Sequence, residues 1–204
     1  MVLAHAPAAH AVGACDAQKQ LAPRKIHHKV PRRPPFALGD SVMLGAAEAL
    51  AHAGIRVDAR GCRQMEAGLD ILARRARRDR LPRAVIVELG TNWVVTRADI
   101  GRALRILDPW QKLVLVTPRV AADAHDAAVM RHAARRHPKR ICLADWARYS
   151  AGRSDWAPGD GIHLSASGIR AFVRLLKPYR RVRRHHPAPC GGSAEKRRSK
   201  HPRR

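Results

Sequence analysis

The chain has 204 residues, enough for one α/β domain with flanking segments. Hydrophobic residues make up 46% of it, so a buried core can form, while aromatic residues make up only 4% and the formal net charge is +24. No stretch approaches the roughly 20 consecutive apolar residues of a membrane-spanning helix. The four cysteines have neither the CxxC spacing nor the accompanying histidines of a zinc site.

Positive charge is concentrated toward both ends of the sequence. Residues 177–204 hold 11 Lys and Arg against one acid, and residues 1–35 hold six against one. Residues 1–34 are rich in Ala, Pro and basic residues, which predicts a disordered basic arm. Residues 178–204 lack apolar periodicity and predict a basic disordered tail. Between them, residues 35–177 are expected to fold as one domain.

Short apolar runs alternate with helical patterns through this middle segment. The expected strands are 36–38, 55–59, 84–89, 113–117 and 141–144. The expected helices are 42–53, 63–78, 97–107, about 122–137, and 166–176 after the N-cap candidate Ser165. Apolar strands that alternate with helices predict an α/β fold, with a parallel sheet covered on both faces.

Polar and small residues follow three of the expected strands. The first strand runs into Gly39-Asp40-Ser41, the second into Gly61-Cys62-Arg63-Gln64, and the third into Gly90-Thr91-Asn92-Trp93. Ligands of such sheets bind beyond the carboxyl ends of the strands. The sequence therefore predicts an active site at this edge.

Ser41 is the candidate nucleophile, because a serine hydroxyl at a strand-to-helix turn can be activated by a nearby base. His163 is the candidate base, since it lies in the loop Asp160-Gly161-Ile162-His163 before the last helix. Asp160 could accept the imidazole Nδ1 proton and turn Nε2 toward the hydroxyl. Simpler explanations remain open: Ser41 as a helix N-cap and Asp160 as a turn residue.

A tetrahedral intermediate also needs hydrogen-bond donors for its oxyanion. Asn92 can supply a side-chain N–H, and the backbone N–H groups of Ser41 and of the Gly61-Cys62 turn can supply two more. The alternative for Asn92 is an ordinary turn residue.

Three blocks of the sequence together resemble the SGNH/GDSL hydrolase family. Gly39-Asp40-Ser41-Val42 is similar to the first block, Gly90-Thr91-Asn92 to the third, and Asp160-Gly161-Ile162-His163-Leu164 to the fifth. More narrowly, residues 36–176 resemble the SGNH domain attached to membrane acyltransferases of the peptidoglycan O-acetyltransferase type. The supporting segments are Met43-Leu44-Gly45, Arg63-Gln64, Val116-Thr117-Pro118-Arg119, Asp145-Trp146 and Asp155-Trp156.

This resemblance implies a three-layer α/β/α, flavodoxin-like fold with strand order 2-1-3-4-5. It implies acyl transfer through an acyl-serine intermediate, with no metal and no other cofactor. The roles that it implies are a catalytic triad of Ser41, Asp160 and His163, an oxyanion hole of Ser41, Cys62 and Asn92, and substrate contacts at Asp40, Arg63, Gln64 and Trp93.

The sequence also departs from the family pattern. Cys62 stands where the second block usually has Gly, and Trp93 stands where relatives often have a small residue. The segment after Pro118-Arg119 lacks the Trp and Asn that relatives often carry. The usual membrane acyltransferase portion is missing from this sequence as well.

The favoured function is a serine-dependent O-acyl, most simply O-acetyl, transferase or esterase acting on a cell-envelope glycan. Its partners would be an acylated glycan or acyl donor, an anionic envelope polymer held by the basic tails, and a separate membrane acyltransferase. The resemblance implies an extracytoplasmic location, although residues 1–14 lack the basic start and apolar run of a signal peptide. The alternatives are a catalytically degenerate SGNH scaffold and a basic polyanion- or nucleic-acid-binding protein. Nucleic acid is disfavoured, because no helix-turn-helix, zinc knuckle or aromatic stacking stripe accompanies the charge.

Overall fold

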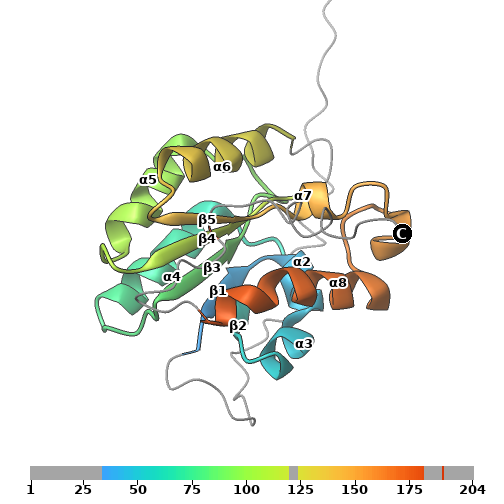
Figure 1. Ribbon diagram of the computed structural model, residues 1–204, viewed down its shortest axis with the longest axis horizontal. Helices are drawn as coiled ribbons and strands as arrows, with labels where there is room; N and C mark the ends of the chain where they lie inside the picture. The colour runs from blue at the N-terminus through green and yellow to red at the C-terminus, as the bar shows by residue number, and fades with distance from the viewer. Residues whose placement is uncertain (1–33, 120–123, 182–189, 191–204) are drawn as a thin grey trace, which may run out of the picture.

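The computed structural model describes residues 34–119, 124–181 and 190. Their centre is a five-stranded parallel sheet in the order β2-β1-β3-β4-β5 (Figure 1). The strands are β1 (Phe36–Gly39), β2 (Arg56–Ala59), β3 (Ala84–Glu88), β4 (Lys112–Val116) and β5 (Ile141–Ala144). The predicted α/β class, three-layer architecture and strand order are confirmed.

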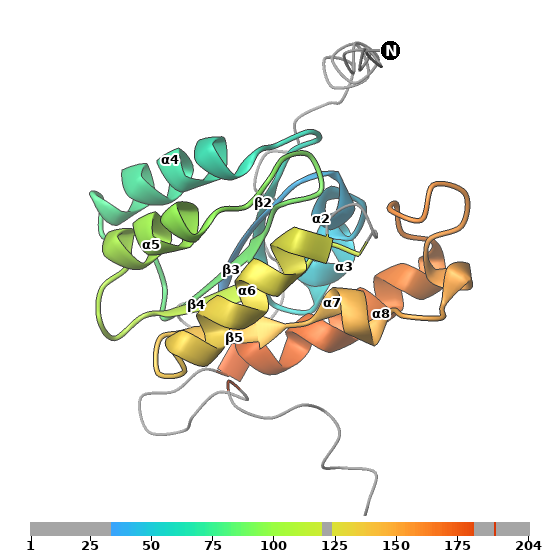
Figure 2. The same cartoon turned by 90° about the horizontal axis from the view of Figure 1, so that it is seen from above.

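Helices cover the sheet on both faces (Figures 1 and 2). One face packs against α4 (Met65–Ala76), α5 (Arg97–Ile106) and α6 (Ala124–Arg136). The other face packs against α2 (Ser41–Gly45), α3 (Ala47–His52), α7 (Trp146–Tyr149) and α8 (Ala166–Leu176).

Strand β3 is apolar at every position before its last residue, because it is covered on both faces. Ile86 belongs to the core on the α8 side, whereas Val85 and Val87 belong to the core on the α4 side. Because side chains alternate along a strand and both faces of this sheet are covered, all five residues of β3 are buried.

The helix expected over 42–53 is instead two short helices. The chain leaves helical conformation at Ala46, with φ −100° and ψ 1°, between α2 and α3. Gly45 directly precedes the break, and glycine is among the weakest helix formers. Three short elements were not expected, because four or five residues carry no readable helical period: α7, the 3₁₀ helix η2 (Ser154–Trp156) and the 3₁₀ helix η3 (Lys177–Arg181).

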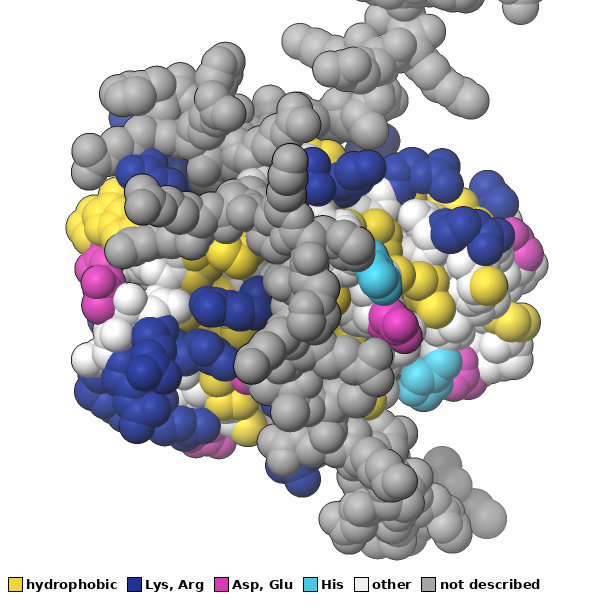
Figure 3. Space-filling view, turned by 90° about the horizontal axis from the view of Figure 1, so that it is seen from below, with side chains coloured by type: hydrophobic (Ala, Val, Ile, Leu, Met, Phe, Trp, Pro, Cys, Tyr) yellow, Lys and Arg dark blue, Asp and Glu magenta, His cyan; other side chains and the backbone are white. Residues whose placement is uncertain are grey.

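The surface is unevenly charged. Figure 3 shows Lys and Arg side chains gathered at the left end of the molecule, which is the end at which the strands in Figure 1 begin, and along its upper right edge. Within the described part of the chain, no helix is long and apolar enough to cross a membrane.

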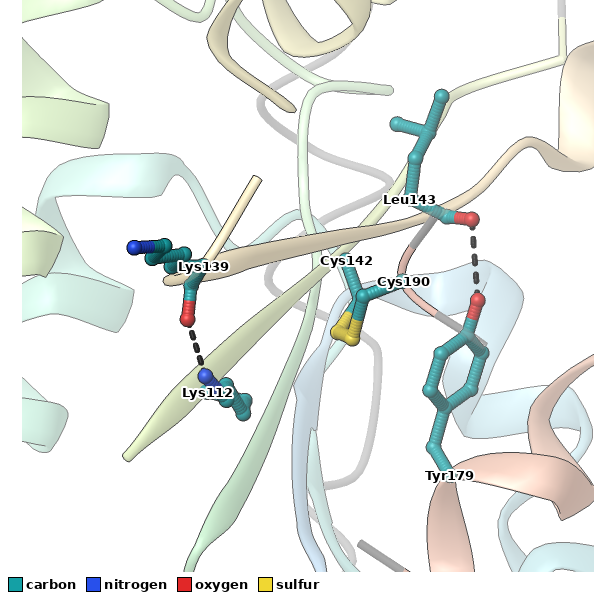
Figure 4. The surroundings of a disulfide bond; sticks show 6 residues. All are labelled: Lys112, Lys139, Cys142, Leu143, Tyr179 and Cys190. Carbon is teal, nitrogen blue, oxygen red and sulfur yellow. Dashed lines mark hydrogen bonds between the residues drawn. A yellow bond between two sulfur atoms is a disulfide. The ribbon is translucent and has the colours of Figure 1, made fainter. Parts of the chain in front are cut away.

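The chain after α8 is attached to β5 at two points (Figure 4). Tyr179 of η3 is buried and its hydroxyl donates to the Leu143 carbonyl oxygen at 2.9 Å. Cys190 forms a disulfide with Cys142 of β5, 48 residues away in sequence. Described structure therefore continues past the boundary expected at 177, to Arg181 and Cys190. Pairing at such sequence separation leaves no local pattern that would have revealed it.

Gly168 lets the start of α8 approach the loop before it. A Cβ atom at this position would lie 2.0 Å from the Trp156 carbonyl oxygen, which also accepts a hydrogen bond from the Ser165 N–H at 3.0 Å. We expect Gly168→Ala to lower the free energy of unfolding by about 1–3 kcal/mol, because backbone must move to admit the methyl group. Gly45→Ala is the control: nothing lies within 4 Å of its Cβ position, and Ala favours a helix. Urea unfolding curves measure both, and equal stability of the two variants would contradict this account.

Candidate active site

The turn from β1 into α2 carries Ser41, the first residue of the helix. Asp40 is the N-cap, and its carboxylate accepts the Val42 backbone N–H at 3.0 Å. Gly39 is required here for space, since a Cβ atom would lie 2.4 Å from the Met43 Cβ and 2.9 Å from Glu88 Oε2. The tight turn leaves Ser41 at the carboxyl edge of the sheet, where Gly39 pairs with Ala59 on one side and Glu88 on the other.

Arg63 holds this turn from the neighbouring loop. Its guanidinium donates to the Gly39 carbonyl oxygen at 3.1 Å, to the Asp58 carbonyl oxygen at 2.6 Å and to the Asp58 carboxylate at 2.9 Å. Arg63 is 5% exposed and Asp40 is 0% exposed. Both residues, which were expected to contact substrate, are thus buried, and their polar groups hold the turn that carries Ser41.

Glu88, at the end of β3, holds the Ser41 turn as well, and the sequence analysis missed it. Its carboxyl is buried and accepts the backbone N–H groups of Met43 at 3.2 Å and Asp40 at 3.4 Å, on either side of Ser41. Burial raises the pKa of Glu88 well above its ordinary value, and the nearby Asp40 carboxylate raises it further. Burial also raises the pKa of Asp40. The sequence feature that could have indicated Glu88 is its place as the single acidic residue at the end of an otherwise apolar strand.

Asp160 and His163 are in contact, as the sequence predicts. His163 Nδ1 lies 2.5 Å from Asp160 Oδ2. The other carboxylate oxygen, Oδ1, accepts the backbone N–H groups of Ile162 at 2.8 Å and His163 at 3.0 Å. The hydrogen bond to the His163 side chain, followed by these backbone bonds, lowers the pKa of Asp160 to about 2. The carboxylate is thus ionised at neutral pH, and the contact leaves the imidazole Nε2 as the nitrogen available to other groups.

The loop that carries this pair is fixed from outside by Arg119, a second residue whose role the sequence analysis missed. Arg119 follows β4 and donates to the Gly161 carbonyl oxygen and to the Arg153 carbonyl oxygen, each at 2.8 Å. Farther in, Trp156 stacks on Trp146 with ring centroids 5.6 Å apart, and Trp146 meets Phe172 of α8 edge-on at 5.2 Å. The loop therefore has anchors in β4 and in the core under α8.

Two candidate oxyanion donors have the features that the role requires. Asn92 Nδ2 is buried and has no hydrogen-bond partner among the described residues, which is a costly state unless a ligand oxygen binds there. Cys62 has φ +53°, a conformation that favours glycine, and it stands where the family pattern has Gly. Cys62 is also disulfide-bonded.

A small cavity joins the three loops. It is lined by Val42, Thr91 and Ile162, the chain neighbours of Ser41, Asn92 and His163. The remaining lining residues are Glu88, Pro118, Arg119 and Trp146. Gln64 and Trp93 are exposed, and Trp93 reaches 68% exposure directly after Asn92. Within residues 34–119 and 124–181, no group of three or more His, Cys, Asp or Glu side chains is arranged to hold a metal ion.

No family model matches the chain. It is 29% identical to the peptidoglycan O-acetyltransferase OatA of Listeria monocytogenes over 144 residues, which are 69% of this chain and 23% of OatA. It is 30% identical to YrhL of Bacillus subtilis over 146 residues, with the same two shares. The C-terminal catalytic domain of Streptococcus pneumoniae OatA superposes with a TM-score of 0.62 at 26% identity, over 72% of this chain and 89% of that domain.

In fold and sequence the chain is similar to the SGNH-type family of hydrolases and acyltransferases. Within this family, it is similar to peptidoglycan O-acetyltransferases, as the sequence blocks indicate. The chain spans less than a quarter of the length of these curated relatives. A family 3 carbohydrate esterase of Clostridium thermocellum shares the fold alone, with a TM-score of 0.54 at 13% identity.

The buried Glu88 carboxyl should make the stability of the domain depend on pH. An unfolded Glu loses its proton near pH 4.5, whereas the folded protein retains it to higher pH. The folded state then binds more protons, so the free energy of unfolding falls as pH rises above about 4.5. Glu88→Gln keeps an oxygen for the Asp40 and Met43 N–H groups and cannot ionise, so we expect a flatter decline between pH 5 and 8. Urea unfolding across this range tests it, with the exposed Glu66→Gln as control; parallel curves for wild type and Glu88→Gln would refute the role of Glu88.

Proposed function

We propose that this chain is a serine-dependent O-acyltransferase or esterase domain, with Ser41, His163 and Asp160 as its catalytic triad. The observation that carries the proposal is the 2.5 Å contact between Asp160 and His163. Ile162, which precedes His163 in the chain, lines the same cavity as Val42 and Thr91. Similarity to the OatA catalytic domain supports the same reading, because the relative named for O-acetyl transfer has the same fold over most of its length.

The reaction begins when Ser41 Oγ attacks the carbonyl carbon of the acyl donor. His163 Nε2 takes the hydroxyl proton, and the ionised Asp160 holds Nδ1 and stabilises the imidazolium. The oxyanion of the tetrahedral intermediate accepts hydrogen bonds from Asn92 Nδ2 and from the backbone N–H groups of Ser41 and Cys62. The intermediate collapses to an acyl-serine while the leaving group takes the proton from His163. An acceptor hydroxyl or water then reverses these steps and frees Ser41.

The substrate class follows from the relatives. OatA of Listeria monocytogenes is named for peptidoglycan O-acetylation, which supports an acetyl group and a cell-envelope glycan as donor and acceptor here. Gln64 and Trp93 are exposed at the edge of the sheet that carries Ser41 and remain the predicted substrate contacts. Because the curated relatives are more than four times as long as the matched segment, a separate membrane acyltransferase remains a proposed partner as supplier of the acyl group.

An extracytoplasmic location fits this substrate. The Cys142–Cys190 disulfide adds support, because disulfides persist in oxidising compartments outside the cytoplasm. The degenerate-scaffold alternative is not favoured, since the Asp160–His163 contact and a free buried donor on Asn92 are features of a working site. Polyanion binding through the tails concerns residues outside the described part of the chain.

Replacing the nucleophile should abolish the chemistry and leave the fold intact. We expect Ser41→Ala to lower p-nitrophenyl acetate hydrolysis at least 10³-fold, because the remaining groups cannot form the acyl-enzyme. Methanesulfonyl fluoride should add one sulfonyl group to the wild type and none to Ser41→Ala; the pneumococcal OatA domain carries a methylsulfonyl adduct. The control is Ser154→Ala, an exposed serine of η2, which should react and hydrolyse like the wild type. Equal hydrolysis or labelling of Ser41→Ala and wild type would exclude the mechanism.

Asp160→Asn should lower kcat by about 10²–10⁴-fold with little change in KM, because an amide neither fixes the imidazole tautomer nor stabilises its charged form. The pKa of Asp160 near 2 adds a second expectation: its ionisation should contribute no inflection to the pH dependence of kcat/KM above about pH 3. Asp155→Asn is the matched control, since this exposed carboxylate lies on the same loop and pairs with Arg153. Steady-state kinetics measures kcat and KM of both variants. Equal kcat values for Asp160→Asn and Asp155→Asn would count against the triad.

A further inference from the structure

A second concave site lies at the amino ends of the strands, opposite the carboxyl edge that carries Ser41. Its volume is about 420 Å³, and it is lined by Pro34, Arg56, Arg75, Asp79, Arg80, Leu81 and Pro82. Pro34 precedes β1, Arg56 begins β2, and residues 80–82 precede β3. The site therefore shares no lining residue with the cavity beside Ser41.

Two of its three guanidinium groups are held in place by the domain. The Arg75 guanidinium lies over the Phe36 ring at 4.2 Å and donates to the Asp58 carboxylate at 3.2 Å. The Arg56 guanidinium lies 5.6 Å from the same ring centroid and donates to the Arg80 carbonyl oxygen at 3.2 Å. Stacking on an aromatic ring fixes the plane of an arginine, so their remaining N–H groups are oriented before any ligand arrives.

The hydrogen bonding of this cluster is incomplete. Arg56 Nε is buried and has no hydrogen-bond partner among the described residues. A buried donor without an acceptor costs free energy. Because this nitrogen is almost fully covered, a ligand in the cavity would meet the other atoms of Arg56 that line it.

Charge in the cavity is unbalanced toward the positive. Burial lowers the pKa of Arg56, and repulsion from Arg75 and Arg80 lowers it further. Asp79 is the acid that lines the cavity, while Asp58 is shared between Arg75 and the buried Arg63. Figure 3 shows further Lys and Arg side chains at this end of the molecule, although others gather at its upper right.

We propose that this cavity binds a phosphate-type oxyanion through Arg56, Arg75 and Arg80. Guanidinium groups match phosphate oxygens in geometry and charge, and a tetrahedral anion can accept from several arginines at once. The cavity is larger than a free ion needs, so it also admits a phosphate group that is part of an anionic polymer. Such a site would hold a polyanion at the end of the domain away from Ser41, and it does not depend on the activity proposed for Ser41.

The test is calorimetric titration of the full chain with two probes, inorganic phosphate and a linear polyphosphate, at 150 mM salt. Binding of both probes assigns the site to the phosphate group itself, and binding of polyphosphate alone assigns it to a phosphate chain. The double variant Arg56→Gln/Arg80→Gln should weaken binding at least tenfold. The control is Arg105→Gln/Arg174→Gln, which removes the same charge from exposed positions on α5 and α8 and should change affinity less than twofold.

The single variant Arg80→Gln tests the proposal if the double variant fails to fold. The Arg80 side chain is exposed, and the substitution keeps the backbone carbonyl oxygen that Arg56 contacts. It should weaken binding at least threefold with an unchanged circular dichroism spectrum. Equal weakening by the cavity variants and the control would attribute binding to net charge and overturn the proposal. Failure of the wild type to bind either probe would overturn it as well.

Discussion

The structure depends on how the end of β1 is held. A nucleophile turn exposes backbone donors and acceptors inside the protein, and each must be paired. Glu88 accepts the N–H groups of Asp40 and Met43, and Arg63 donates to the carbonyl oxygen of Gly39. The turn is thus fixed on both sides of Ser41 by a side chain at the end of β3 and by one from the loop that follows β2. Burying an acid and a base for this purpose costs free energy, and the cost is offset only while all of these hydrogen bonds are intact.

The loop that carries Asp160 and His163 differs from the Ser41 turn, because it is ordered by local hydrogen bonds and not by burial. Asp160 and His163 are half-exposed, with side-chain exposures of 47% and 54%. Their geometry comes from short-range bonds, because Asp160 accepts two backbone N–H groups of its own loop. The loop as a whole is then attached through Arg119 and through the Trp156–Trp146 stack. A locally ordered pair on an anchored loop can face the rigid turn of Ser41 without being buried itself.

This contrast explains what the sequence could and could not predict. The strands and the Asp160–His163 contact depend on periodicity or on neighbours three residues apart, so they are readable in one sequence, whereas the strand order was implied only by the family resemblance. Asp40 and Arg63 were expected to touch substrate because polar residues next to a nucleophile suggest it, yet they are buried beneath the turn. The role of Glu88 depends on pairing across 45 residues, and the Cys142–Cys190 disulfide on pairing across 48. Long-range pairs of this kind are fixed by tertiary packing, so a local pattern does not reveal the partners, even where a lone acid such as Glu88 ends an apolar strand.

The exposure of the triad loop bears on the choice between hydrolysis and transfer. Water can reach a half-exposed imidazole, so the acyl-serine proposed for Ser41 would have no protection from hydrolysis built into the domain. Transfer then requires the acceptor itself to displace water when it binds. Trp93 is 68% exposed and Val94 53% exposed, directly after Asn92, which is unusual for large apolar side chains on a surface this basic. A sugar ring stacked on Trp93 would cover this apolar surface and bring its hydroxyl groups to the edge that carries Ser41. Under the proposed mechanism, acceptor binding and exclusion of water would then be one event.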